Sequence, residues 1–411
     1  MSPARHMRIV YVNHTGRVSG AERVLINMVR GLDRERFEAF VVCPADSDLT
    51  RLLSAEDVTC VALPPVQARF SQSPVALWNA VTSLAGAVKI LRTTLQLLHP
   101  DLVHANTLRA GIVASLACVG TGRKVVWHLH DILPRHPIST LIRLSAVALR
   151  PARIVAVSHA TAEAFGDPGA INSRITTIHN GIDLSRFPLK NTGASTELKQ
   201  RLNIPDDAFV VCAVGQVCAR KGLLELVQAF EQAHSKAPKM HLVIAGSVVF
   251  EHEREYFNRL QSAASAEQIA SHVHFTGEVE NVSALLQAAD LLVLNSIEEP
   301  FGLVLVEAMS SGTPVLAASV GGVPEIVTDS INGWLVEKGD TAALAAKLVE
   351  LSQHPDLLRR IAITARCETC PQFSLERFQS RLNRLYTELD RPPTSQWNAH
   401  NQPAVAVDGD D

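Results

Sequence analysis

Two glutamates that bracket the start of a predicted helix are the residues of this 411-residue chain best placed to do chemistry. They are Glu299 and Glu307, in the segment Glu299-Pro-Phe-Gly-Leu-Val-Leu-Val-Glu307. Residues 290–295 before them suit a buried parallel strand, and Gly312 ends the helix. Free backbone N–H groups at a helix start attract phosphate or sugar oxygens. A carboxylate there repels an anion, so we expect the two glutamates to bind hydroxyl groups, in which ribose and hexose rings are rich.

Two cations occupy a similar strand-to-helix turn earlier in the second half. The segment Val214-Gly215-Gln216 ends a predicted strand, and Arg220 and Lys221 follow beside the first helical turn. Cations are unfavourable at that end of the helix dipole. Their position is easier to explain if they neutralise a bound phosphate, although a solvated pair remains an alternative.

A glycine-containing loop follows the first predicted strand. In His14-Thr-Gly16-Arg-Val-Ser-Gly20 the glycines allow the backbone to approach a diphosphate closely. The spacing differs from the Gly-x-Gly-x-x-Gly dinucleotide fingerprint, so it does not favour a nicotinamide cofactor. A simple tight turn is an equal alternative.

A histidine also ends a strand of the first half. In Trp127-His128-Leu-His130-Asp131, His130 would project from the strand end into a ligand cleft, and the adjacent Asp131 could orient it. A structural histidine is the alternative. We predict no metal site, because the Asp46-Ser-Asp48 spacing follows an outer strand and can cap the next helix.

Strand-like and helix-like segments alternate along the whole chain, which predicts an α/β protein with doubly wound parallel sheets. Residues 1–190 form an expected first domain, and a polar stretch at 180–196 suits a linker. Residues 191–372 repeat the scheme, and the polar tail at 391–411 is expected to be disordered. Two such domains form a cleft at the carboxyl ends of both sheets, where ligands bind in this architecture.

Composition places the chain among globular proteins of the cytoplasm. It is 47% apolar and 19% charged, and no run of about 20 apolar residues predicts a membrane span. We expect no signal peptide, because residues 1–5 before the first strand lack an apolar region. The seven cysteines are scattered, and the Cys367-Glu-Thr-Cys370 pair has no second pair for zinc, so we expect reduced thiols.

Charge is divided unevenly between the two halves. Residues 1–190 carry 21 Lys and Arg against 13 Asp and Glu, a net +8, whereas the remainder carries 17 against 28, a net −11. A basic half on an acidic chain suggests an anionic partner, such as a membrane surface, a lipid phosphate or an acidic sugar. Nucleic acid is not expected, because no basic motif is interleaved with aromatic residues.

Taken together, these segments resemble the retaining glycosyltransferases of family four, which have the GT-B fold of two facing Rossmann-like domains. The likeness covers nearly the whole chain and implies that a helix at 373–390 packs back on the first domain. One departure is Gln216, where many members have arginine, and Arg220 is the candidate replacement. The most specific segments are Glu299-x7-Glu307, Gly312-x-Pro314 and Gly321-Gly322-x-Pro324-Glu325, supported by Gly20-Ala-Glu22, His130-Asp131, Val157-Ser158, His179-Asn180-Gly181-Ile-Asp183 and Lys221-Gly222.

The resemblance implies a role for each matched residue. Glu307 would hold the ribose hydroxyls, and Glu299 would hold hydroxyls of the donor sugar. Arg220 and Lys221 would stabilise the departing diphosphate in place of a metal ion. His130 would contact the donor sugar near the reacting carbon. Backbone groups lining the phosphate and acceptor sides would come from Gly16, Gly20, Gly215, Phe301, Gly302, Leu303 and Val304.

The implied reaction moves a sugar from a nucleotide diphosphate donor of the UDP, GDP or ADP type to an acceptor hydroxyl, with retention. The acceptor would be a glycan or a lipid-linked molecule, anionic if the charge asymmetry reflects it. Assembly of cell-surface polysaccharide, lipopolysaccharide or glycolipid at the inner membrane face would suit such an acceptor. The alternatives are an epimerase or phosphorylase of the same shape, and a non-catalytic subunit that binds a nucleotide sugar.

Overall fold

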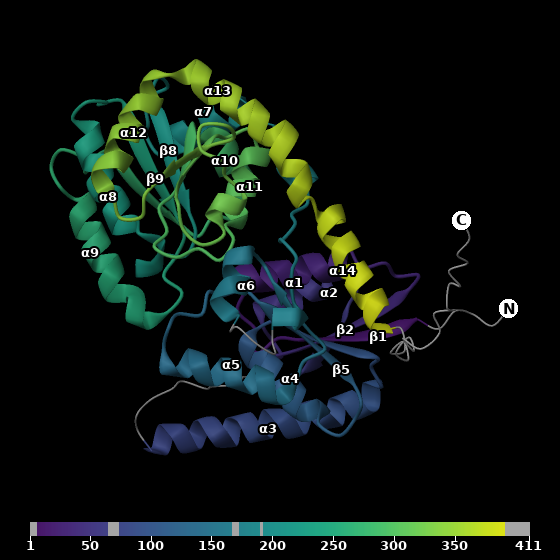
Figure 1. The fold of residues 1–411 in the computed structure, drawn as a ribbon. Coiled ribbons are helices and arrows are strands. Elements are labelled where there is room, and N and C mark those ends of the chain that lie inside the picture. Colours follow the sequence, from purple (N-terminus) through teal and green to yellow (C-terminus); the bar gives the residue numbers. More distant parts are fainter. Residues whose placement is uncertain (1–5, 65–73, 167–171, 190–191, 391–411) are drawn as a thin grey trace, which may run out of the picture.

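The computed structural model describes residues 6–64, 74–166, 172–189 and 192–390, which form two α/β domains (Figure 1). The tail at 391–411 and the expected boundary at residues 190 and 191 lie outside the described residues. Within the described part of the chain, no helix has the length and apolar character needed to span a bilayer. All seven cysteines are described, and none of them forms a disulfide.

The first domain is built on seven parallel strands in the order β3-β2-β1-β4-β5-β6-β7. One face packs against α1, α2 and the C-terminal helix, and the other against α3, α4 and α5, so the central strands are buried on both faces and are mostly apolar. The strands are β1 (Met7–Val12), β2 (Phe37–Cys43), β3 (Thr59–Ala62), β4 (Leu102–Ala105), β5 (Lys124–Leu129), β6 (Arg153–Ala156) and β7 (Ile175–Thr177). The helices are α1 (Gly20–Arg30), α2 (Asp48–Ser54), α3 (Pro74–Leu98), α4 (Leu108–Cys118), α5 (Pro137–Leu149) and α6 (His159–Phe165).

The second domain has six parallel strands in the order β10-β9-β8-β11-β12-β13. The predicted pair of doubly wound parallel sheets is therefore confirmed. The strands are β8 (Phe209–Val214), β9 (Met240–Ala245), β10 (Val273–Gly277), β11 (Leu291–Leu294), β12 (Val315–Ala318) and β13 (Trp334–Val336). The helices are α7 (Thr192–Arg201), α8 (Leu223–His234), α9 (Arg254–Ala264), α10 (Val282–Ala288), α11 (Leu303–Ser310), α12 (Thr341–Gln353) and α13 (Pro355–Thr364).

The linker is shorter than the polar stretch at 180–196 suggests, because α7 begins at Thr192 inside it. The helix is anchored at its far end, where Leu198 is buried and Lys199 Nζ donates to the carbonyl oxygens of Asp206 at 2.7 Å and Ala208 at 2.9 Å. Few apolar residues mark this helix, so its periodicity is too weak to distinguish it from a loop.

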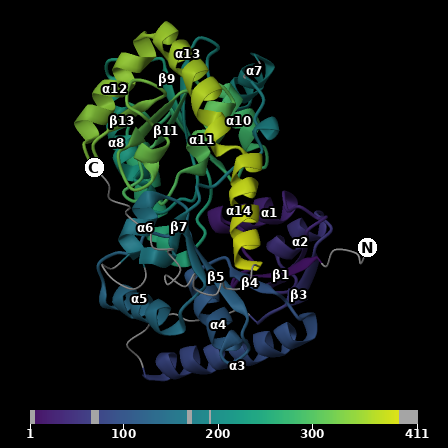
Figure 2. The same ribbon diagram turned by 45° about the vertical axis from the view of Figure 1, so that its right-hand side comes forward.

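The chain crosses between the domains twice, and the crossings lie side by side. Leu375 N donates to Ile182 O at 2.8 Å, and Ile182 N donates to Phe373 O at 3.0 Å. The last helix, α14 (Leu375–Asp390), then runs across the first domain beside α1 (Figures 1 and 2). Its apolar stripe, which includes Phe378 and Tyr386, belongs to the core of the first domain.

Two glycines meet where β8 and β9 end. Gly215 and Gly246 both have φ of +148°, and a Cβ on Gly246 would lie 1.7 Å from Gly215 O. At Gly246 neither the backbone angle nor the space admits a side chain, whereas at Gly215 the backbone angle alone favours glycine. The two strand ends can therefore approach this closely only with glycine at both positions.

Replacing Gly246 by alanine should lower the unfolding free energy by about 1–3 kcal/mol, because the clash forces the backbone to move. The measurement is the midpoint of thermal unfolding. The matched control is Gly86→Ala in α3, where an added Cβ meets no atom within 4 Å. That change should be neutral or stabilising by about 0.5–1 kcal/mol. Equal midpoints for Gly246→Ala and the wild type would contradict the steric argument.

Candidate active site

The carboxyl ends of the two sheets face each other, and residues from both domains meet there. A Cβ on Gly321 would lie 2.8 Å from Ile132 Cδ1, and one on Gly322 would lie 3.0 Å from Ser158 Cβ. The glycines therefore allow the turn after β12 to pack against the ends of β5 and β6. Most of the sequence-predicted site residues lie in the loops around this junction.

Glu299 and Lys221, which are 78 residues apart in the chain, form an ion pair of 2.6 Å between Oε2 and Nζ. Glu299 is buried in the loop between β11 and α11, and Ser296 Oγ also donates to its Oε2, at 3.1 Å. Lys221 ends a 3-10 turn between β8 and α8. Oε1 of the glutamate and two of the three ammonium protons have no partner among the described residues. The pair can therefore present an acceptor for a hydroxyl and donors for a phosphate.

The start of α11 supplies unpaired backbone donors next to this pair. Gly302 adopts a left-handed conformation with φ of +100° and is the N-cap of α11. No hydrogen bond in the described part of the chain uses the N–H groups of Gly302, Leu303 or Val304. Phe301 differs, because its ring is buried and stacks on His179 with the centroids 5.8 Å apart. Its side chain belongs to the domain contact, and only its backbone is available to a ligand.

Glu307 lies one turn into α11 and faces the first domain. The protein packed around its carboxyl raises the pKa of Glu307, while the positive charges of Arg23 on α1 and of Arg186 act to lower it. The residue as a whole is half-buried. It is therefore brought to the junction separately from Glu299, with basic residues as its electrostatic neighbours.

Arg220 has different neighbours from Lys221. Its guanidinium donates to Glu298 O at 3.5 Å. Desolvation raises the pKa of Asp131, and the positive charges of Arg220 and Arg109 act in the opposite direction. Arg220 of the second domain thus lies near Asp131 of the first.

Gly215, at the end of β8, donates its N–H to Ala245 O at 2.9 Å and lies close to the Lys221 side chain.

His130 ends β5 as expected, but Asp131 does not orient it. Its Nε2 lies 3.1 Å from Asn106 Oδ1, an atom at the end of the neighbouring strand β4. Its ring lies 4.3 Å from that of His128, and burial lowers the pKa of His130 to about 3. Consecutive residues at a strand end point in opposite directions, which is why the adjacent Asp131 is the wrong partner.

The two glycines of the first loop have different surroundings. A Cβ on Gly16 would lie 2.3 Å from Ser47 Cβ, so this glycine is required by packing against the start of α2. Gly20 begins α1 and has open space around it. In the Asp46-Ser-Asp48 segment the cap of α2 is Ser47, whose Oγ accepts from Thr50 N at 3.3 Å. That segment therefore has a structural role.

The domains are joined by a glutamate whose role the motif alone does not reveal. Glu325 accepts from the N–H groups of His159 and Ala160, each at 2.9 Å, and lies 2.7 Å from His179 Nε2. Together with both histidines it is the one set of three candidate metal ligands that converges among the described residues. Because three donors already satisfy its two oxygens, we interpret it as an ionic contact between domains.

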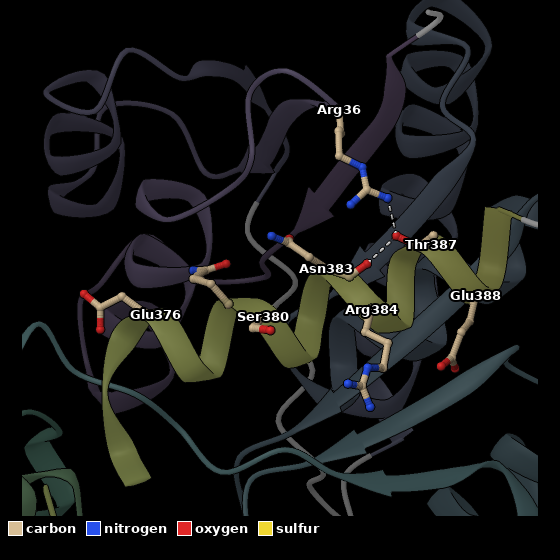
Figure 3. A pocket seen from close by; sticks show the side chains of 8 residues that line it. Arg36, Glu376, Ser380, Asn383, Arg384, Thr387 and Glu388 are labelled. Atoms are coloured by element: carbon tan, nitrogen blue, oxygen red, sulfur yellow. Dashed lines mark hydrogen bonds between the residues drawn. The ribbon is translucent and has the colours of Figure 1, made fainter. Parts of the chain in front are cut away.

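A shallow pocket on the outer side of α14 contains none of these groups (Figure 3). It is lined by Arg36 and by seven residues of α14, and Arg36 Nη2 donates to Thr387 Oγ1 at 2.7 Å across it. It is polar and open, and no unpaired buried charge faces it. We assign it no function.

Comparison with known proteins identifies the family. Residues 194–367 match the model "Glycosyl transferases group 1", and residues 18–186 match "Glycosyltransferase Family 4". D-inositol 3-phosphate glycosyltransferase of Salinispora arenicola is 30% identical over 313 residues, which cover 71% of this chain and 69% of that protein. The chain belongs to the family-4 glycosyltransferases. Members of this family retain the configuration of the transferred sugar and do not use a metal ion.

Two further proteins are similar to this glycosyltransferase over most of its length. N-acetyl-alpha-D-glucosaminyl L-malate synthase of Bacillus anthracis is 28% identical over 303 residues, covering 73% of this chain and 76% of the relative. The crystal structure of Anabaena Alr3699/HepE in complex with UDP-glucose superposes with a TM-score of 0.81 at 27% identity. It covers 93% of this chain and all of that one. The expected GT-B fold and nucleotide-sugar transferase activity are thus confirmed.

Replacing Glu325 by glutamine should weaken the domain contact by about 1.5–3 kcal/mol, the value of hydrogen bonds to a charged group. Burial acts to raise the pKa of Glu325, but hydrogen bonds from His179, His159 and Ala160 outweigh it and leave the pKa below its ordinary value of 4.5. The stabilisation is therefore present above pH 4.5 and is lost as the pH falls through the lowered value.

Thermal unfolding from pH 7 to pH 3 measures this, and the difference between wild type and Glu325→Gln should shrink as the pH falls below 4.5. Small-angle scattering at pH 7 should show a more open variant. The control is Glu350→Gln, which removes an exposed pair with Lys347 and should cost less than about 1 kcal/mol. A Glu325 effect that persisted unchanged at pH 3 would contradict the carboxylate's role.

Proposed function

We propose that this glycosyltransferase moves a hexosyl group from a UDP-sugar to a glycan or lipid-linked acceptor in cell-surface polysaccharide or glycolipid assembly. The observation that supports binding of the sugar donor is the buried Glu299–Lys221 pair, which lies beside the unpaired N–H groups at the start of α11. UDP is favoured over GDP and ADP because the Anabaena relative binds UDP-glucose. Family membership favours transfer over an epimerase, a phosphorylase or a non-catalytic subunit.

In the proposed complex the diphosphate lies between the cations and the start of α11. Lys221 donates its two unused protons to phosphate oxygens, Arg220 adds a second positive charge, and the N–H groups of Gly302, Leu303 and Val304 supply neutral donors. Gly215, Gly16 and Gly20 allow the backbone to lie close to this group. The arriving anion is thus held by the protein's own charges and dipoles.

The two glutamates bind hydroxyl groups on opposite sides of that diphosphate. Glu299 accepts from the transferred sugar through its free Oε1, and Glu307 accepts from the ribose. His130 contacts the sugar from the first domain. As the bond from the anomeric carbon to the phosphate oxygen breaks, the bond to the acceptor oxygen forms on the same face. The acceptor proton passes to the departing phosphate oxygen, so no separate base is needed.

Glu299→Ala and Glu307→Ala should each lower kcat/KM for the donor about ten- to a hundred-fold, because each loses a charged hydrogen bond worth about 1.5–3 kcal/mol. The assay uses the sugar nucleotide that gives the largest thermal shift among UDP, GDP and ADP types, which should be a UDP-sugar. Glu350→Ala, an exposed glutamate of α12, is the matched control and should retain wild-type kinetics. Near-wild-type kinetics in both test variants would overturn the site.

The acceptor half of the proposal rests on the outer face of the first domain. Large apolar side chains are exposed there on α3 and α5, which lie together at the end of the molecule away from the second domain (Figures 1 and 2). Arg135 and Arg150 are exposed around them, while Arg143 is occupied by the carbonyl oxygens of Leu133 and Ala164. Exposed apolar and cationic groups on and beside these two helices suit an anionic membrane surface. The apolar residues are Trp78, Val81, Ile90, Leu97, Leu141, Leu144 and Val147.

Vesicles containing phosphatidylglycerol should bind the protein in a flotation assay, and binding should weaken at least several-fold between low salt and 0.5 M salt. Substituting Leu141 and Leu144 by serine should reduce binding while leaving transfer to a soluble acceptor unchanged. Neutral phosphatidylcholine vesicles are the control. Absence of binding, or binding insensitive to both salt and the substitutions, would overturn the membrane proposal.

A further inference from the structure

A chain of side-chain hydrogen bonds runs from the start of α1 through the ends of two strands to His130. It begins at Glu22, whose Oε2 accepts from Ser19 N at 3.0 Å and which is 2% exposed. The next links are Asn13 after β1 and Asn106 after β4, both fully buried. None of these three residues is expected to touch the donor or the acceptor, so their effect on the reaction acts through His130.

The orientation of the first amide follows from its neighbours. Asn13 Nδ2 lies 2.7 Å from Thr15 O and 3.1 Å from Glu22 Oε1. A backbone carbonyl oxygen only accepts, so the nitrogen of the amide must face it. The Oδ1 atom of Asn13 is therefore directed to its other partner, Asn106, from which it accepts a hydrogen bond at 3.1 Å.

The second amide is oriented in the same way. Asn106 Nδ2 donates to Asn13 Oδ1 at 3.1 Å and to Ala21 O at 3.0 Å. The opposite orientation would place its oxygen against a carbonyl oxygen and leave its own N–H groups facing the ring. Asn106 Oδ1 must therefore face His130 Nε2, at 3.1 Å. An amide oxygen accepts only, so Nε2 carries a proton.

The remaining ring nitrogen then becomes an acceptor. Burial lowers the pKa of His130 to about 3, so the imidazole is neutral near neutral pH and carries a single ring proton. With that proton on Nε2, the Nδ1 atom has a lone pair, and no described residue hydrogen-bonds to it. His128 on β5 and His104 on β4 are the titratable rings nearest to His130 in the core, and Asp131 follows it in the chain.

We propose that Asn106 and Asn13 are positioning residues that hold His130 in the Nε2-protonated tautomer, so that Nδ1 accepts a hydrogen bond from a hydroxyl of the donor sugar. The inference rests on the proposed function, because it gives a direction to the contact assigned there to His130. A lone pair favours a neutral sugar that presents a hydroxyl. It disfavours a donor that presents a methyl group or a carboxylate, whose oxygen would repel it.

The tautomer is measured first, without activity, by long-range 1H–15N correlation spectra of protein labelled with 15N-histidine. The His130 signals are identified by their loss in His130→Gln. In the wild type they should show a protonated Nε2 and an unprotonated Nδ1. Asn106→Leu should give a mixture of tautomers, whereas Asn332→Leu, a buried asparagine of the second domain, should leave them unchanged. A protonated Nδ1 in the wild type would overturn the proposal.

The second measurement is the pH profile of kcat/KM in Asn106→Asp. This variant keeps the size of the side chain and changes its charge. A carboxylate beside Nε2 stabilises the imidazolium and raises the pKa of His130. Below that pKa Nδ1 is protonated and the acceptor is lost. From pH 8 to pH 5.5 the kcat/KM of the variant should therefore fall by a factor at least ten times larger than that of the wild type, and it should recover at high pH. A purely structural role predicts parallel profiles, which would overturn the proposal.

A panel of deoxy donors closes the test. One deoxy donor lacks the hydroxyl that donates a hydrogen bond to His130 Nδ1. With that donor, most of the difference in kcat/KM between wild type and Asn106→Asp should disappear, whereas the other deoxy donors should preserve it. If no deoxy position did so, the donor contact would be wrong even with the tautomer as expected. If the wild type bound no nucleotide sugar in calorimetry, the proposed function would fail together with that contact, and the spectra would still decide the tautomer separately.

Discussion

The arrangement of the site depends on the contact that Glu325 makes across the domain junction. Its carboxylate accepts from the first turn of α6 and from His179, so one side chain of the second domain binds two elements of the first. The contact lies close to the two chain crossings, since the rings of His179 and Phe373 are 5.8 Å apart. Residues from opposite domains can act on one substrate only while the domains stay together, and this contact adds to the two chain crossings and to the packing of Phe301 on His179.

Charges of opposite sign lie near one another at the junction, and one of them, Lys221, forms a direct ion pair. Lys221 is neutralised by Glu299, Arg220 is near Asp131, and Glu307 faces basic residues of the first domain. An unpaired buried charge is costly, so the bond to Lys221 offsets the cost of burying Glu299. The arrangement is well suited to a reaction in which charge develops on a departing diphosphate, because the protein's dipoles are already oriented.

A neutral hydrogen-bond network on the first-domain side complements these charges. Polar groups in the core are tolerated only when they are satisfied, and Asn13 and Asn106 each use both ends of the amide. The same requirement decides the protonation of His130, since only one arrangement of donors and acceptors leaves no conflict. Hydrogen bonds among core residues can in this way decide whether His130 presents a donor or an acceptor to the site.

The sequence by itself determined the class of sheet, the helix after Glu299 and the turn that carries Lys221, because each depends on apolar periodicity or on residues within one turn of each other. It did not reveal α7, whose few apolar residues give no clear period, nor the partner of His130, for which the adjacent Asp131 was the wrong choice. Only the tertiary structure decided that Lys221 pairs with Glu299, that Glu325 joins the domains and that Asn106 orients His130. These partners lie 24 to 166 residues apart in the chain, and hydrogen bonds over such separations depend on sheet order and domain packing, which local patterns do not encode.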